Sequence, residues 1–242
     1  MKFVSDAPSA LPYLVAAFVV AALLSLVLTP LVRRRAVRLG VVDRPNHRRV
    51  NTRPVPRAGG IAVALAFLVV AIVVVAINDQ LHLVRTPASL DAGQLIALLA
   101  GGAAAAAIGA IDDYLDLRAR WQLIGQVALA AGAVVLGIEI GRVNNPFGPN
   151  AIPFDEPFAA GFTVLWILGM LNSVNFIDGL DGLSSGIALI AAVTLGVISL
   201  TTATAQVGQP FVAVLCFVLA GALLGFLRWN FHPAAIFTGT SG

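Results

Sequence analysis

The segment NSVNFIDGLDGLSSG carries four polar side chains at intervals of three residues between strongly apolar stretches. Two are amides, Asn172 and Asn175, and two are carboxylates, Asp178 and Asp181. Side chains three residues apart share one face where the chain is helical. Carboxylates beside apolar segments are costly unless a cation neutralises them. The spacing therefore indicates a site that binds a cation or a ligand carrying one.

A second acidic cluster, IDDYLD, holds Asp112, Asp113 and Asp116. If the preceding helix continues, Asp112 and Asp116 lie on one face, four residues apart. Aspartate and asparagine offer hard oxygen ligands, and the sequence has no cluster of cysteine or histidine, so we expect Mg²⁺, or alternatively Mn²⁺, rather than zinc. The plain alternative is that these acids are polar helix ends facing water.

These clusters must be positioned by membrane-spanning helices. The chain has 242 residues, 59% of them hydrophobic and 11% charged, with a mean hydropathy of +0.92, which is outside the range of soluble domains. About 20 apolar residues cross a bilayer as a helix. We predict an all-α polytopic transmembrane helical bundle, a single integral membrane domain over 1–242, with about seven spans: 11–32, 59–77, 93–111, 122–138, 159–174, 184–203 and 210–227.

Cations fall mainly on one side of this predicted topology. With the N-terminus outside, twelve of the 15 Lys and Arg residues lie on one side, and only Lys2, Arg85 and Arg142 lie on the other. The positive-inside rule makes the basic side cytoplasmic. We therefore expect a multi-pass protein of the bacterial inner membrane with an active cytoplasmic face and no nucleic-acid partner. The cytoplasmic loops are expected near 33–58, 112–121, 175–183 and 228–242, and the outer loop 141–158 is rich in turn formers typical of a hairpin.

Magnesium accompanied by arginines suggests a phosphate substrate, because the metal and guanidinium groups bind phosphate oxygens together. Arg57, in PVPRAGG, and Arg120 are the candidate phosphate ligands. Each is equally well interpreted as a topology anchor or a contact to anionic lipid. The sequence has neither a GxxxxGK[ST] loop nor a GxGxxG turn after a strand, which argues against the common nucleotide-binding folds.

Four segments together resemble a known family. DRPNHRRVNTRPVPRAGGIAV, IGAIDDYLDLRARWQLIGQ, NSVNFIDGLDGLSSG and GFLRWNFHPAAIFTGTSG are similar, in order and spacing, to the cytoplasmic motifs of the polyprenyl-phosphate N-acetylhexosamine-1-phosphate transferases, glycosyltransferase family 4. The resemblance implies transfer of a sugar-1-phosphate from a UDP-sugar to a membrane polyprenyl phosphate, releasing UMP, as the first step of a cell-envelope polysaccharide. PVPRAGG resembles the N-acetylglucosamine branch, and the family makes a homodimer an expectation.

The resemblance also implies roles for individual residues. Asp112 and Asp113 match the paired aspartates of the family as catalytic residues, one acting on the lipid phosphate and the other lying beside the metal. Asn175 matches an asparagine that binds magnesium. The remaining positions are expected to bind substrate: Asn172, Asp178 and Asp181 in the nucleotide-sugar pocket, and Arg57 and Arg120 on phosphates.

The sequence departs from the family pattern at Thr240. Relatives typically read FMGDSGS where this chain reads IFTGTSG, so Thr240 replaces an aspartate that binds magnesium. A hydroxyl is a poorer magnesium ligand than a carboxylate. We therefore expect a chain that is incomplete at the C-terminus relative to the family, and hypothesise that it is catalytically impaired. A scaffold homologue without chemistry is an alternative, and a cation transporter is a weaker one because the acids cluster at helix ends.

Overall fold

The computed structural model describes residues 7–43, 53–84, 86–87, 90–201 and 209–242. The described part of the chain contains seven helices: α1 Ala7–Leu39, α2 Gly60–Leu81, α3 Ala92–Leu115, α4 Ala119–Val135, α5 Glu156–Ile177, α6 Leu183–Thr201 and α7 Pro210–Asn230. Six are long and apolar enough to cross a membrane, and α4, with 17 residues, is shorter. The predicted all-α polytopic membrane bundle is thereby confirmed.

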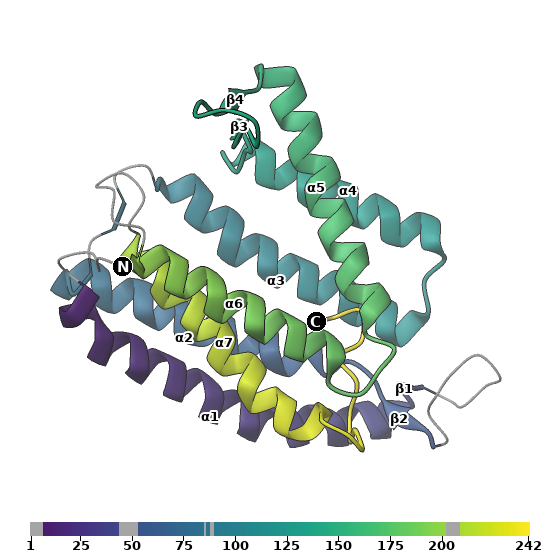
Figure 1. The fold of residues 1–242 in the computed structure, drawn as a ribbon. Helices are drawn as coiled ribbons and strands as arrows, with labels where there is room; N and C mark the ends of the chain where they lie inside the picture. Colours follow the sequence, from purple (N-terminus) through teal and green to yellow (C-terminus); the bar gives the residue numbers. More distant parts are fainter. Residues whose placement is uncertain (1–6, 44–52, 85, 88–89, 202–208) are drawn as a thin grey trace.

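Two short antiparallel hairpins lie outside the helices. β1 (Val42–Asp43) pairs with β2 (Val55–Pro56) between α1 and α2, and β3 (Arg142–Val143) pairs with β4 (Ile152–Pro153) between α4 and α5. The second pair confirms the hairpin expected in the loop 141–158. Figure 1 places the two hairpins at different ends of the molecule.

Local sequence signals set several helix boundaries. Asp91 precedes α3 and its carboxylate accepts the backbone N–H of Gln94 at 2.8 Å, which caps the helix start. Proline occupies the first turn of α5 and of α7, where its missing N–H is tolerated. α3 ends because Asp116 adopts a left-handed conformation with φ of 51°.

α7 is the central helix of the packed core. Of its most apolar window, 67% is buried, against 6% for α5. α7 packs against α1, α6 and α2, and its fully buried side chains include Val214, Val218 and Phe226. Two glycines four residues apart, Gly221 and Gly225, allow α7 to approach α1. A Cβ added to Gly221 would lie 2.2 Å from the carbonyl oxygen of Phe18, and a Cβ added to Gly225 would lie 2.1 Å from that of Ala22.

The helical bundle brings most predicted polar segments to one end. The ends of α1, α3, α5 and α7 and the starts of α2, α4 and α6 lie near that end, together with β1 and β2 (Figure 1). Arg33, Arg34, Arg35 and Arg38 belong to α1 rather than to a loop. The remainder of the predicted loop 33–58 includes 44–52, which lie outside the described residues, as do Lys2 and Arg85.

Candidate active site at one end of the helical bundle

The segment 231–242 after α7 forms one wall of the candidate site. Its backbone pairs with the residues that join β2 to α2: Phe237 N–H donates to Pro56 at 2.9 Å, and its carbonyl accepts Gly59 N–H at 2.9 Å. Gly60 N–H donates to the Thr238 carbonyl at 2.8 Å. The approach needs glycine, because a Cβ on Gly60 would lie 2.1 Å from Gly242.

Asp113 is buried where α3 meets this segment. Its side chain is 3% exposed, and its two carboxylate oxygens accept the backbone N–H groups of Thr240 at 3.0 Å and Ser241 at 3.1 Å. One turn earlier, Gly109 provides the space, since a Cβ there would lie 2.2 Å from the Thr240 carbonyl oxygen. The carboxylate is thus fixed by two donors, and each oxygen keeps a further lone pair.

Asp112 has a different environment from its neighbour Asp113. It is half-buried and its carboxylate accepts the backbone N–H of Leu117 at 3.1 Å, just beyond the end of α3. The condition under which Asp112 and Asp116 would share a helical face is not met, because the helix stops at Leu115 and Asp116 is left-handed. Asp112 therefore stabilises the helix end while remaining accessible.

Asp178 lies in the turn after α5 rather than on a helical face. Its carboxylate accepts the Ser184 hydroxyl at 2.5 Å and the Gly239 N–H at 2.9 Å. Burial raises the pKa of Asp178 above its ordinary value, and the hydrogen bonds from Ser184, Gly239 and Thr238 oppose that rise. Asp178 thus connects the α5–α6 turn to the same segment that meets Asp113.

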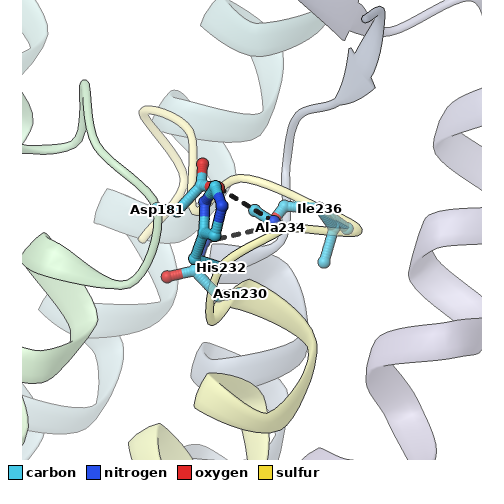
Figure 2. A network of polar contacts seen from close by, with 5 residues as sticks. All are labelled: Asp181, Asn230, His232, Ala234 and Ile236. Atoms are coloured by element: carbon cyan, nitrogen blue, oxygen red, sulfur yellow. Dashed lines mark hydrogen bonds and ion pairs between the residues drawn. The ribbon is translucent and has the colours of Figure 1, made fainter. Parts of the chain in front are cut away.

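Asp181 makes the second connection between these two segments. Its Oδ2 lies 2.8 Å from Nδ1 of His232 and accepts the backbone N–H of Ala234 at 3.0 Å (Figure 2). Asn230, which is 1% exposed, accepts the Ser185 hydroxyl at 2.5 Å and donates to the carbonyl of Ile236 at 2.9 Å. Asp181 and Asn230 therefore hold the segment on both sides of the His232–Pro233 bond.

The two amides of the opening motif separate in the structure. Asn172 donates to Gln126 of α4 at 2.8 Å and to the Leu168 carbonyl of its own helix at 2.8 Å. Asn175 lines a cavity of about 210 Å³ that Gln126 and Thr240 also line. Asn175 thus faces the same space as the segment that binds Asp113, whereas Asn172 joins α5 to α4.

That cavity combines a polar end with a wall of small and apolar side chains. Its polar lining comes from Gln122, Gln126, Asn175, Thr240 and Ser241. Its remaining wall is contributed by α2, α3, α4, α5 and α7 and by the chain end: Gly60, Val63, Ala64, Phe67, Gly102, Ala105, Ala106, Ile108, Gly109, Leu129, Leu171, Leu219, Gly239 and Gly242. Such a space suits a ligand with one charged end and one apolar end.

The two candidate phosphate-binding arginines differ in position. Arg57 lies close enough to Asp113 to act on it electrostatically, and its Nη2 is 3.9 Å from Asp116. The Nε of Arg57 is buried and has no hydrogen-bond partner within the described ranges. Arg120 is exposed, with its guanidinium 5.6 Å from the centre of the Trp121 ring. Arg57 therefore borders the site, whereas the described contact of Arg120 is with Trp121.

The donor chemistry of the site fits magnesium that is shared with a substrate. Over the part of the chain that the structure describes, no three His, Cys, Asp or Glu side chains form a metal-binding group. Two oxygen donors adjoin Thr240: the Asp113 carboxylate, which accepts its N–H, and Asn175, which lines the same cavity as Thr240. Magnesium commonly binds through one or two carboxylates while keeping waters and taking phosphate oxygens. The set therefore fits Mg²⁺ or Mn²⁺ with phosphate, and does not form an all-protein cage.

Sequence reasoning missed several residues that build this site. Ser184 and Ser185 follow the predicted acids in GLSSG and bind Asp178 and Asn230, respectively. Asn230, the last residue of α7, pairs with Ser185 of α6. The only available signal was the abundance of short polar residues between two apolar segments, which indicates a polar network without identifying the partners.

Comparison with known proteins agrees with the geometry. A "Probable undecaprenyl-phosphate N-acetylglucosaminyl 1-phosphate transferase" of Bacillus subtilis is 32% identical over 95% of this chain and 59% of its own length. A "Decaprenyl-phosphate N-acetylglucosaminephosphotransferase" of Mycolicibacterium smegmatis is 35% identical over 92% of this chain and 54% of its own length. A "Phospho-N-acetylmuramoyl-pentapeptide-transferase" of Staphylococcus aureus is 28% identical over 95% of this chain and 71% of its own length.

The chain spans 59% and 54% of the first two of these relatives. The family model described as "Glycosyl transferase family 4" matches residues 95–242, which include Asp113, the α5–α6 turn and the segment after α7. A match over more than half of the chain, covering the residues that converge at one end of the bundle, establishes that this chain belongs to glycosyl transferase family 4.

Proposed function

We propose that this protein transfers a sugar-1-phosphate, N-acetylglucosamine 1-phosphate in particular, from a UDP-sugar to a membrane polyprenyl phosphate and releases UMP. The observation that carries the proposal is the convergence of Asp113, Asn175 and Arg57 at one end of a membrane-spanning bundle. The names of the first relatives, which specify N-acetylglucosamine and a polyprenyl phosphate, support the choice of substrates.

The reaction joins two anions, so neutralisation of charge is its main requirement. An oxygen of the polyprenyl phosphate attacks the phosphorus that carries the sugar, a new P–O bond forms, and the P–O bond to UMP breaks. Arg57 would hold phosphate oxygens, since its buried Nε has no protein partner within the described ranges. Asp112, which is more accessible than Asp113, would orient the attacking phosphate or take a proton from it.

Asp113 and Asn175 are the residues that would hold a magnesium ion. The ion would supply Lewis acidity to the phosphate oxygens. Asp113 enters the reaction already fixed by the N–H groups of Thr240 and Ser241, so little reorganisation of this carboxylate is needed. The remaining candidate substrate contacts come from elements at the same end of the bundle: Asn172, Asp178, Asp181 and Arg120.

The location of the site suits a lipid acceptor. We place the active end in the cytoplasm of a bacterial cell and the N-terminus outside the inner membrane, on the basis of the cation distribution. A polyprenyl tail would stay in the hydrocarbon layer while its phosphate reaches Asp112 and Arg57. The UDP-sugar would arrive from the aqueous side.

A single-turnover assay tests the proposed function. The full chain in lipid nanodiscs, given radiolabelled UDP-N-acetylglucosamine, undecaprenyl phosphate and Mg²⁺, should form a lipid-linked product and an equal amount of UMP. Asp113→Asn should lower the rate by about a hundredfold or more, because one fixed charge is lost. Asp155→Asn, an exposed acid before α5, is the matched control and should leave the rate unchanged.

The outcome that would contradict the proposal is the absence of product from both the natural chain and the Thr240→Asp variant. A flux of cations into liposomes that needs Asp113 but no UDP-sugar would instead favour a transporter.

A further inference from the structure

α7 packs against α1 through a row of close contacts, and the two helices lie beside each other in Figure 1. A Cβ added to Gly221 would meet the carbonyl of Phe18, and one added to Gly225 would meet that of Ala22. From the first contact to the second, each helix advances by four residues, or about one turn. The two helices therefore run in the same direction and approach closely at intervals of one turn.

The next contact in this row is a hydrogen bond. Trp229 lies one turn after Gly225 on α7, and its indole Nε1–H donates at 3.1 Å to the carbonyl of Leu26 on α1. In a regular helix that carbonyl would accept the N–H of residue 30, but residue 30 is proline, which has no N–H. Trp229 thus supplies the hydrogen bond that Pro30 removes from α1.

The surroundings of this carbonyl make its hydrogen bond important. Leu26 lies within the apolar membrane-spanning part of α1, and its neighbours Ser25 and Thr29 are 0% exposed. The Thr29 hydroxyl donates to the Ser25 carbonyl at 2.7 Å, so a second carbonyl beside Pro30 also accepts a side chain. A carbonyl without a donor is costly where water is absent, and prolines in membrane helices are tolerated where a neighbouring helix replaces the lost donor.

Pro30 and Trp229 together select one register of the two helices. Small residues at intervals of one turn would also allow α7 to lie one turn further along α1 or one turn back. One turn back, the indole would meet the carbonyl of Ala22, which already accepts the N–H of Leu26 within α1, and Leu26 would lose its donor. The observed register pairs the indole with the carbonyl that Pro30 leaves free, as a single polar group fixes the register of an apolar helix pair.

Trp229 also stands at the start of the segment that forms the candidate site. It is the penultimate residue of α7, and its backbone carbonyl accepts the N–H of Ala235 at 2.8 Å, which closes the first turn of segment 231–242. Further along the segment, the N–H of Thr240 donates to Asp113 of α3. The position of Trp229 along α1 therefore sets where this segment meets Asp113.

We propose that Trp229 is a positioning residue: its indole binds the carbonyl that Pro30 frees in α1, and this pair fixes the register of α7 and the placement of segment 231–242. Trp229 then acts on the reaction through the contacts of Thr240 and Ser241 with Asp113. The kinetic consequence rests on the proposed function, whereas the structural consequence does not.

A double-mutant cycle followed by hydrogen–deuterium exchange tests the structural part, with the full chain in nanodiscs. Trp229→Phe keeps an aromatic ring but removes the donor. It should speed the exchange of segment 237–241 by about fivefold or more, because a buried acceptor is left unpaired. Pro30→Ala supplies an N–H four residues after Leu26. In that background Trp229→Phe should change the exchange by less than about twofold.

Two variants are matched controls for this cycle. Pro12→Ala, at an exposed proline of the same helix, should leave the effect of Trp229→Phe as large as before. Trp166→Phe, at a 55% exposed position on α5, should leave the exchange of segment 237–241 unchanged. Equal acceleration by Trp229→Phe with and without Pro30→Ala would overturn the proposal, and so would no acceleration in the natural chain.

The indole N–H gives a measurement that needs no proline variant. A chain labelled with ¹⁵N-tryptophan has three indole signals, and Trp229→Phe identifies the one that belongs to Trp229. This N–H should exchange with water at least about tenfold more slowly than that of Trp121, which is 54% exposed at the start of α4. Exchange as fast as that of Trp121 would overturn the proposal.

Kinetics connect the register to the reaction. The single-turnover assay uses whichever of the natural chain and Thr240→Asp forms product. Trp229→Phe should lower the maximal transfer rate by about fivefold, leave the half-saturating UDP-N-acetylglucosamine concentration within about twofold, and recover its rate with Pro30→Ala. A raised half-saturating concentration with an unchanged maximal rate would overturn the proposal in favour of a substrate contact. If neither chain forms product, the proposed function fails, and the exchange and indole measurements still decide whether Trp229 fixes the register.

Discussion

Thr240 stands where the family motif FMGDSGS has an aspartate that binds magnesium. The backbone N–H of Thr240 donates to Asp113. Thr240 also lines the cavity that Asn175 lines. A carboxylate at position 240 would therefore stand at the wall of that cavity, next to the backbone contact with Asp113. We hypothesise that the chain, as a transferase, is impaired because it lacks one carboxylate of its metal site.

Substituting this residue tests the hypothesis. Thr240→Asp should raise the transfer rate and lower the Mg²⁺ concentration for half-maximal activity by about tenfold, because a carboxylate is a stronger magnesium ligand than a hydroxyl. Titration of the single-turnover assay with Mg²⁺ measures both. Thr240→Asn, of similar size and without charge, is the control. An equal gain from Asn and Asp would mean that charge at position 240 is irrelevant.

Asp178 provides a prediction about pH. Because burial raises its pKa in the folded protein, the folded state holds the proton more tightly than the unfolded state does. The free energy of unfolding should therefore fall as pH rises from the ordinary aspartate pKa through the raised one, and then stay level. Asp178→Asn should reduce this fall, which thermal unfolding followed by tryptophan fluorescence over that pH range measures. The same fall in Asp178→Asn and in the natural chain would contradict the assignment.

At the scale of elements, the contact between α1 and α7 depends on two glycines. Gly225→Ala should lower stability by about 1–3 kcal/mol, because its Cβ would clash with the Ala22 carbonyl and force the helices apart. Gly169→Ala is the matched control, since nothing lies within 4 Å of an added Cβ on that helical glycine. Thermal unfolding in detergent measures the difference, and equal melting temperatures would refute the close-contact argument.

Helices were predictable from the sequence, but the way they end was not. Apolar runs of sufficient length predicted seven helices near their observed positions. The stop of α3 at Leu115 depends on Asp116 adopting a left-handed conformation, which the sequence DDYLD does not reveal. The placement of Asp113 and Asn175 at one end followed from alternating spans. By contrast, the partners of Asp178, Asp181 and Asn230 are set by tertiary packing between distant segments.

For the whole molecule, the predicted orientation can be tested in cells. Cys216 is the single cysteine, so Cys216→Ala gives a background without thiols. In that background, Phe147→Cys, at a 98% exposed position beside the β3–β4 hairpin, should react with a membrane-impermeant thiol reagent added outside. Arg118→Cys, exposed at the start of α4, should react only after the cells are permeabilised. Labelling of Arg118→Cys from outside and of Phe147→Cys only after permeabilisation would show that the orientation is opposite to the proposed one.

The pairing of segment 237–241 with Pro56, Gly60 and Asp113 joins the last described residues to three earlier elements. During synthesis, α2 and α3 are made long before Ser241 is translated, so the Asp113 carboxylate must wait for its two N–H donors. Insertion of the early helices and the fixing of Asp113 are therefore separate events in time. A ribosome stalled before residue 239 would hold a membrane-inserted chain in which Asp113 still lacks the N–H groups of Thr240 and Ser241.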